Sequence, residues 1–178
     1  MKKSVKPVNT RMLVNLGLLS AIEIVLTRFC NIPLTPTMWL NFGFLPIAVA
    51  AVLYGPIPAG TAYAVCDILG ALLFPKGAYL PGLTLTAFLI GLTYGLFLHN
   101  FNKNWIKLLS AVLITAIALD LGVKTIFLLP IYDKGYIVLF WERTLKCAVM
   151  IPIQTVLIWF VVDRLTPMLR RFTKTGDS

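Results

Sequence analysis

Charged residues are scarce in this sequence, and acidic ones are the scarcest of them. Of 178 residues, 13% are charged and 58% are hydrophobic, and seven Asp and Glu stand against 16 Lys and Arg, for a net charge of +9. A soluble domain has about 25% charged and about 45–50% apolar residues. The composition therefore excludes an ordinary water-soluble domain, and its hydrophobicity excludes disorder. A basic, strongly apolar chain favours an integral membrane protein over one that binds nucleic acid.

Common catalytic and nucleotide-binding motifs are missing as well. The sequence has no GxxxxGK[ST], HExxH, GxSxG or GxGxxG pattern. Its three cysteines lie far apart without a CxxC pair, which argues against a disulfide framework and a zinc site. We therefore expect no catalytic residue, metal or cofactor. A membrane-embedded enzyme acting on lipid is an alternative, but its candidate residues, Asp67 and His99, do not fall at one expected depth.

Six apolar runs make up most of the chain. Pro, Gly, Asn and charged residues separate these runs, which cover residues 12–29, 42–54, 57–74, 83–98, 106–129 and 137–162. A membrane-spanning helix takes roughly 20 residues, so one helix from 42 to 74 would be too long, and Gly55-Pro56 divides it. The sequence predicts an all-α membrane protein with six transmembrane helices in a single domain, 1–178, with tails at 1–11 and 166–178. The segment NIPLTPTMWLN, with its two prolines, is expected to be a loop.

The positive charges fall into two groups along this expected topology. Because six spans put both termini on one side, ten of the 16 share that side: Lys2, Lys3, Lys6, Arg11, Lys103, Lys107, Arg164, Arg170, Arg171 and Lys174. Lys and Arg near the ends of spans are enriched in the cytoplasm, so both termini are predicted to be cytoplasmic. The other six lie at or near the opposite ends, against this trend: Arg28, Lys76, Lys124, Lys134, Arg143 and Lys146.

Two acid–base pairs lie among these outer charges. Asp120 with Lys124, and Glu142 with Lys146, are four residues apart, so each pair shares a helix face. A charged side chain inside the membrane costs about 2.5–3.5 kcal/mol on insertion scales and usually faces a cavity or a partner. These charges are therefore either self-neutralising pairs or side chains that extend toward the interface. The sequence alone assigns no role to Asp120.

Two arginines point to a ligand instead. Arg28 and Arg143 have no acidic residue four positions away. A guanidinium binds a carboxylate through two hydrogen bonds, so these side chains favour a site for an anion. Aromatic residues flank the same outer loops, among them Trp39, Tyr79 and Trp141. They fit either an interfacial aromatic belt or a planar, aromatic and acidic ligand.

The first apolar run carries small residues at helical spacing. Gly17 and Ala21 are four residues apart, and Val25 continues the row. Small residues let another transmembrane helix approach closely, either within this chain or from a partner. The buried-charge candidates Glu23 and Asp67 have no evident role in the sequence.

Three stretches carry a resemblance to a known family: FGFLPIAVAAVLYGP (42–56), DILGALLFPKGAYLPGLTLTAFLIGLTYG (67–95) and RTLKCAVMIPIQT (143–155). The chain resembles the substrate-binding S components of energy-coupling factor (ECF) vitamin transporters, most closely those for folate. The resemblance implies six helices, cytoplasmic termini and a bacterial plasma-membrane location. It implies that a transmembrane T subunit and two ATPase subunits are the partners, with ATP hydrolysed by the latter.

The resemblance also implies roles for particular residues. Folate has two carboxylates and flat rings, so Arg28, Arg143, Lys124 and Lys146 would bind its carboxylates or its polar pterin edge. Trp39, Tyr79 and Trp141 would contact the rings, and Thr84 would give a hydrogen bond. Gly17, Ala21 and Val25 would dock on the T subunit, after which the chain would topple within the membrane. A different acidic vitamin, such as pantothenate, is the alternative; the outer cations disfavour cationic thiamine and riboflavin, which lacks an acid.

Overall fold

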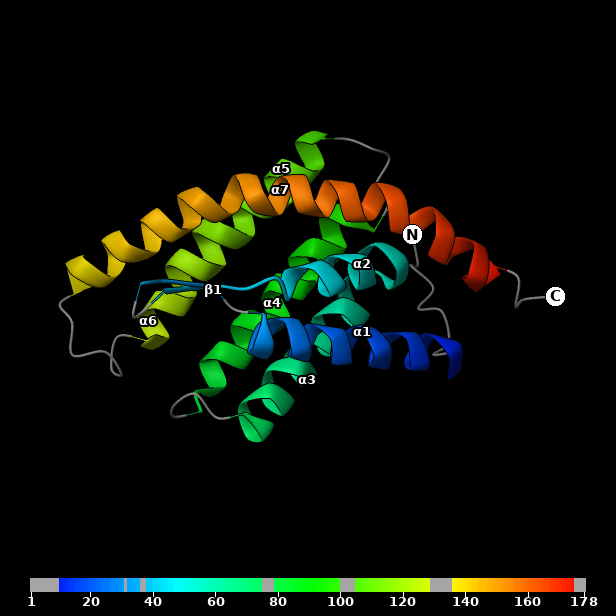
Figure 1. The fold of residues 1–178 in the computed structure, drawn as a ribbon, viewed down its shortest axis with the longest axis horizontal. Coiled ribbons are helices and arrows are strands. Elements are labelled where there is room, and N and C mark those ends of the chain that lie inside the picture. The colour runs from blue at the N-terminus through cyan, green and yellow to red at the C-terminus, as the bar shows by residue number, and fades with distance from the viewer. Residues whose placement is uncertain are drawn as a thin grey trace, which may run out of the picture.

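The computed structural model describes residues 10–30, 32–35, 38–74, 79–99, 105–128 and 136–174. Within these ranges the chain is almost entirely helical (Figure 1). In chain order the elements are α1 (Thr10–Phe29), β1 (Ile32–Thr35), β2 (Met38–Leu40), α2 (Phe44–Tyr54), α3 (Pro56–Leu73), α4 (Pro81–Leu98), α5 (Trp105–Ile114), the π-helix η1 (Thr115–Val123), α6 (Lys124–Leu128) and α7 (Tyr136–Lys174).

Five helical segments are long and apolar enough to cross a membrane: Thr10–Phe29, Pro56–Leu73, Pro81–Leu98, Trp105–Phe127 and Arg143–Arg164. Each coincides with a predicted apolar run. The remaining predicted run, 42–54, forms α2, whose 11 residues reach about 16 Å at about 1.5 Å per residue, against a hydrocarbon core of about 30 Å. The six predicted helical segments are therefore present, but α2 is too short to span the bilayer by itself.

The short helix α2 lies at the centre of the packing. Eight of its 11 residues are buried, and Ile47, Ala48 and Ala50 have no exposed surface. The sequence predicted the end of α2 at Gly55-Pro56. Gly55 has a φ of +88°, which residues with a side chain rarely adopt, and Pro56 begins α3, where the missing amide hydrogen is not needed. An all-apolar helix of this length is thus stabilised by burial between its neighbours.

Two stretches have secondary structure that the sequence predictions did not include. The expected loop between the first two runs contains an antiparallel hairpin, in which Ile32 pairs with Leu40 and Pro33 with Trp39. The final helix, α7, continues to Lys174, so it includes part of the expected tail at 166–178. The apolar pattern ends near residue 162, and the backbone stays helical beyond it, where Arg, Leu and Met favour a helix and Pro167 disfavours one.

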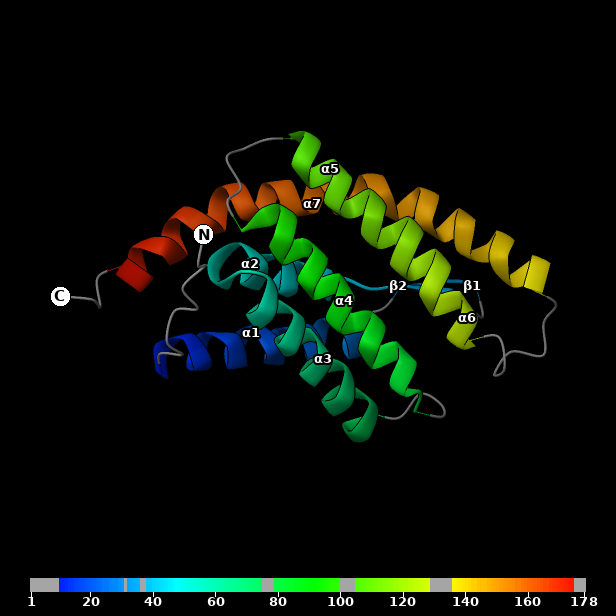
Figure 2. The ribbon, with the colours of Figure 1, turned by 180° about the vertical axis from the view of Figure 1, so that it is seen from behind.

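Helices α3 and α4 approach each other through glycines. A Cβ added at Gly91 would lie 2.6 Å from the carbonyl oxygen of Ala59, and one added at Gly95 would overlap the backbone of Pro56. The start of α3 and the end of α4 are therefore in direct backbone contact. Figure 2 shows the two helices side by side, with α5, η1 and α6 continuing as one rod beside α7.

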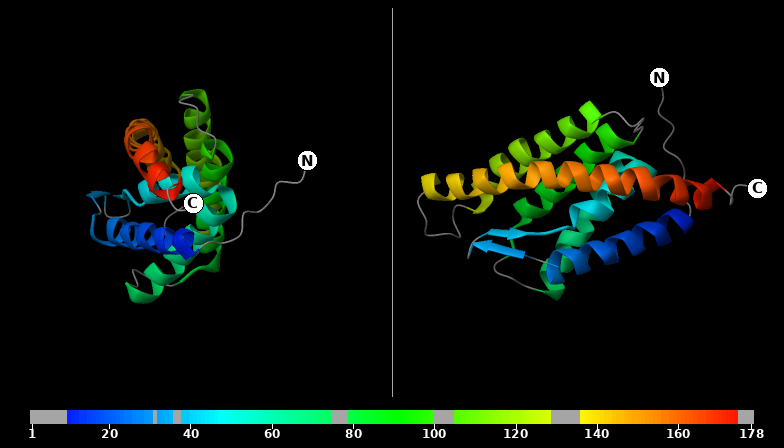
Figure 3. Two further views of the ribbon diagram at one scale, coloured as in Figure 1. Left: turned by 90° about the vertical axis from the view of Figure 1, so that its right-hand side faces the viewer. Right: turned by 45° about the horizontal axis from the view of Figure 1, so that its top comes forward.

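The two ends of the molecule are formed by different elements. The start of α1 and the end of α7 lie at the same end (Figure 1, right; Figure 3). The end of α3, the hairpin, α6 and the start of α7 lie toward the opposite end (Figure 3, right). The residues expected to bind a ligand come from this second set of elements.

Candidate functional site

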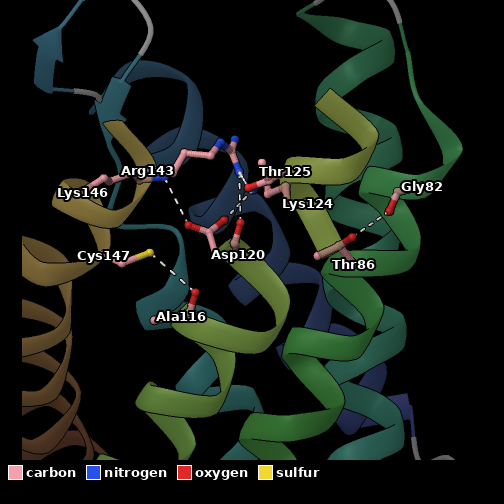
Figure 4. Close-up of polar contacts among 9 residues, drawn as sticks. All are labelled: Gly82, Thr86, Ala116, Asp120, Lys124, Thr125, Arg143, Lys146 and Cys147. Atoms are coloured by element: carbon pink, nitrogen blue, oxygen red, sulfur yellow. Dashed lines mark hydrogen bonds and ion pairs between the residues drawn. The ribbon is translucent and has the colours of Figure 1, made fainter. Parts of the chain in front are cut away.

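One carboxylate in the membrane segment Trp105–Phe127 lies between two lysines from different helices. The Oδ1 atom of Asp120 is 3.4 Å from Nζ of Lys124, one turn along the same rod, and its Oδ2 atom is 3.4 Å from Nζ of Lys146 in α7 (Figure 4). Arg143, one turn before Lys146, completes what we call the Asp120 cluster: Asp120, Lys124, Arg143 and Lys146. It contains three positive charges and one negative charge.

Arg143 contacts the backbone of this cluster rather than its carboxylate. Its Nη1 atom donates to the carbonyl oxygen of Asp120 at 3.0 Å and to Oγ1 of Thr125 at 3.3 Å. Cys147 donates in the same way to the carbonyl oxygen of Ala116 at 3.5 Å (Figure 4). Donors four residues apart in α7 thus meet carbonyls four residues apart in η1, and they fix the register of the two helices.

The π-helical conformation of η1 coincides with these contacts. π-Helices are rare and often occur at functional sites. The nine residues of η1 include Ala116 and Asp120, whose carbonyls accept the bonds from α7. The wider turns of the π-helix therefore occur in the segment that carries Asp120 and contacts α7.

A cavity of about 60 Å³ adjoins the cluster. Its walls combine two lysines and one acid with aromatic, aliphatic and uncharged polar groups: Asn41, Phe44, Tyr63, Ile90, Tyr94, Thr115, Ala116, Asp120, Lys124, Lys146, Cys147, Met150 and Gln154. Pockets for drug-sized ligands are typically about 300–1,000 Å³. This cavity therefore has room for one end of such a ligand, beside cationic and aromatic groups.

Arg28, expected to bind an anion, contacts the end of α3. Its Nη1 atom donates to the carbonyl oxygen of Phe74 at 2.9 Å, and the ring of Phe29 meets that of Phe74 edge-on, with centroids 5.4 Å apart. A cation at a helix C-terminus interacts favourably with the helix dipole. Arg28 thus joins α1 to α3, and it is not among the residues that line the cavity.

Tyr79 and Thr84 are linked to an acid that the sequence left without a role. Thr84 Oγ1 donates to Oδ2 of Asp67 at 2.7 Å, and the hydroxyl of Tyr79 lies 2.8 Å from Thr84 Oγ1. Because the one hydroxyl hydrogen of Thr84 is directed at Asp67, Tyr79 donates to Thr84. This chain of bonds connects α3, the first turn of α4 and Tyr79, which lies two residues before α4.

The remaining expected ligand contacts lie elsewhere or outside the described part. The side chain of Trp141 is 69% exposed and does not line the cavity. The backbone of Trp39 is in β2, but its side chain lies outside the described residues, as do Lys76 and Lys134. The side chain of Glu142 lies outside them too, and Lys146 pairs with Asp120.

Sequence reasoning missed most of the cavity wall. Asn41, Tyr63, Tyr94 and Gln154 carry no motif, and only the fold brings them together. The spacing of four residues between Asp120 and Lys124 predicted that these two side chains pair. It did not predict that Lys146 also contacts Asp120. Among the described residues, no group of three or more His, Cys, Asp and Glu lies close enough together to hold a metal ion.

A second surface lies along α1. Gly17, Ala21 and Val25 are all exposed, together with large apolar neighbours such as Leu18 and Ile22. A Cβ built on Gly17 would meet nothing within 4 Å. Packing within the described part of this chain therefore does not require a small residue at position 17.

Comparison with known proteins identifies the family. Residues 7–166 match the family described as "ECF-type riboflavin transporter, S component". The chain belongs to the S components of ECF-type transporters. It is 40% identical over 159 residues to "Folate transporter FolT" of Clostridium novyi, covering 88% of this chain and 92% of that one. It is 27% identical over 161 residues to "Folate transporter FolT" of Leuconostoc mesenteroides, covering 87% and 86%.

A solved structure has the same fold. "Crystal structure of FolT bound with folic acid" matches this S component with a TM-score of 0.81 and 29% identity, over 88% of this chain and 95% of that chain. The predicted S-component fold is therefore confirmed. An S component is a membrane transport subunit and not an enzyme, so the alternative of a lipid-modifying enzyme is wrong.

Proposed function

We propose that this S component binds folate at the Asp120 cluster and the adjoining cavity. Two relatives are named folate transporters, and a structure with the same fold is described as holding folic acid. The observation that carries the proposal is the excess of positive charge beside the cavity among the described side chains: Lys124 and Lys146 flank the carboxylate of Asp120, and Arg143 donates to its backbone carbonyl. A ligand with acidic groups supplies the missing negative charge.

The hydrogen-bond donors of the cluster outnumber the acceptors that the described residues give them. Each lysine ammonium has three donors, and a guanidinium has five. Lys146 and Lys124 each contact one oxygen of Asp120, and the two described bonds of Arg143 use only Nη1. The two carboxylates of folate accept hydrogen bonds only, whereas riboflavin, the vitamin in the family description, has no acid. The cluster therefore favours folate.

The uncharged walls suit the rings of the same ligand. Tyr63, Tyr94 and Phe44 line the cavity beside Met150 and Ile90. Aromatic rings pack on one another in stacked or edge-on geometries, and methionine fits irregular aromatic surfaces. The cavity holds one end of folate, and the rest extends toward the starts of α4 and α7, near which Tyr79 and Trp141 lie.

Lys146 gives the sharpest test of this assignment. We expect Lys146→Gln to weaken folate binding by about 30-fold or more, because removing one partner of a buried charged pair costs about 2–5 kcal/mol. Lys107→Gln removes the same charge from an exposed position in α5, outside the cavity lining, and is expected to bind like the unmodified chain. Isothermal titration of the purified proteins measures both. Equal affinity in the two variants would contradict the proposal.

The exposed face of α1 supports a docking role. Gly17 is not required by packing within the described residues, yet it lies with Ala21 and Val25 in one exposed row. Small residues allow close approach of another transmembrane helix. We assign this row to the T subunit of the ECF module, whose two ATPase subunits supply the energy. With cytoplasmic termini, the cavity end of the molecule faces outward and captures folate before the chain topples.

A further inference from the structure

The carboxylate of Asp120 lies in the cavity wall between the two lysines that line the same cavity. Both of its contacts are 3.4 Å long, whereas charge-assisted bonds from nitrogen to a carboxylate are normally about 2.7–2.9 Å. The side chain also keeps 23% of its surface exposed. Asp120 therefore neutralises Lys124 and Lys146 without binding either of them tightly.

The backbone of Asp120 is held independently of this side chain. Arg143 donates to its carbonyl oxygen, and Cys147 donates to the carbonyl oxygen of Ala116 one turn earlier. Both bonds join η1 to α7 without involving the carboxylate. A movement of the carboxylate away from the two lysines would therefore leave these contacts between η1 and α7 in place.

We propose that Asp120 is a resident counter-ion of the cavity and a determinant of ligand charge. In the protein without ligand its carboxylate neutralises Lys124 and Lys146, and on binding it yields this position to a carboxylate of the ligand. The inference rests on the proposed function, because it takes the ligand to be an acid bound at the Asp120 cluster. With Asp120 present the cluster carries two net positive charges, which match a ligand with two carboxylates.

Charge repulsion between Asp120 and an acidic ligand lowers the affinity for that ligand. Two like charges about 6 Å apart repel at an effective dielectric constant of about 20, which weakens the binding of an acid by about 10- to 100-fold. The benefit appears in the protein without ligand, where removing Asp120 leaves three cations close together. Removing this carboxylate is therefore expected to destabilise the ligand-free protein and to strengthen folate binding.

Asp120→Asn tests the inference by titration with folate and with pteroate, which has one carboxylate. We expect about 10- to 100-fold tighter folate binding, a smaller gain for pteroate, a lower Tm without ligand and a larger rise of Tm with folate. Asp177→Asn, which removes the same charge near the C-terminus of the sequence, is the control and is expected to match the unmodified chain. These measurements use the full-length chain purified in detergent.

A second comparison keeps the test valid if Asp120→Asn alone does not fold. In the Lys124→Gln background the same Asp120→Asn change leaves two cations and no acid, which restores the net charge of the original cluster. It is again expected to strengthen folate binding relative to Lys124→Gln alone. If the unmodified chain binds folate but neither Asp120→Asn comparison shows tighter binding, the counter-ion role is wrong. If the unmodified chain does not bind folate, the proposed function fails, and this inference fails with it.

Discussion

Gly43 lies so close to α1 that a side chain does not fit there. A Cβ added at this position would overlap Oγ1 of Thr27 and lie 2.8 Å from Oε1 of Glu23. Gly43 immediately precedes α2 and its neighbour Phe44 lines the cavity, so the contact joins the helix with the exposed small-residue row to the cavity wall. We expect Gly43→Ala to lower the free energy of unfolding by about 1–3 kcal/mol, the usual cost of overpacking.

A compensating change makes this prediction specific. Thr27→Ala removes the overlapping oxygen and leaves the Cβ of residue 27 at 3.4 Å from the added methyl group. By itself it removes the 2.7 Å bond from Thr27 to Glu23, a side chain only 3% exposed, at a cost of about 1–3 kcal/mol. The double variant with Gly43→Ala should therefore be about as stable as Thr27→Ala alone.

The four proteins of this cycle are compared by thermal unfolding in detergent, followed by circular dichroism, and by folate titration. A coupling of about 1–3 kcal/mol between the two changes is expected, since residues in contact are not additive. Additive losses, or a Gly43→Ala protein as stable as the unmodified chain, would refute the close approach of α1 and α2. Weaker folate binding in Gly43→Ala, restored in the double variant, would follow from the displacement of Phe44.

Two further predictions concern orientation and docking. Cys30 is exposed at the end of α1, whereas Cys66 and Cys147 are buried. A membrane-impermeant maleimide added to whole cells should therefore label the unmodified protein but not its Cys30→Ser variant. Labelling that requires permeabilised cells would reverse the proposed orientation. Ala21→Trp should abolish uptake by the assembled transporter while the isolated chain still binds folate, and Leu109→Trp, exposed on α5, should leave both intact. Loss of binding in Ala21→Trp would instead indicate internal packing.

The helices were predictable because the membrane imposes a simple pattern. A span must satisfy its own backbone hydrogen bonds and keep apolar side chains for about 20 residues, so apolar runs and their Pro and Gly boundaries locate α1, α3 and α4 closely. The hairpin was missed because three or four residues per strand, interrupted by prolines, give too short an alternation to recognise. The π-helix was missed because its sequence, TAIALDLGV, has the composition of an ordinary apolar helix.

The candidate site was only partly predictable for a similar reason. The outer positive charges and the spacing of Asp120 and Lys124 indicated an unusual group of charges in the membrane. Lys146 is 26 residues from Asp120, so their contact depends on the packing of α7 against η1. Arg28 carried the same sequence signal as Arg143, yet its partner is the end of α3, which no local spacing reveals.

The central claim is that the excess of positive charge beside this cavity binds folate. Its most direct test is isothermal titration of the purified, unmodified chain with folate, riboflavin, pantothenate and thiamine, each added separately. We predict one folate per chain, bound more tightly than any of the other three. Tighter binding of riboflavin, which has no acid, or of cationic thiamine would contradict the account, and tighter binding of pantothenate would leave the acidic site but reassign its ligand.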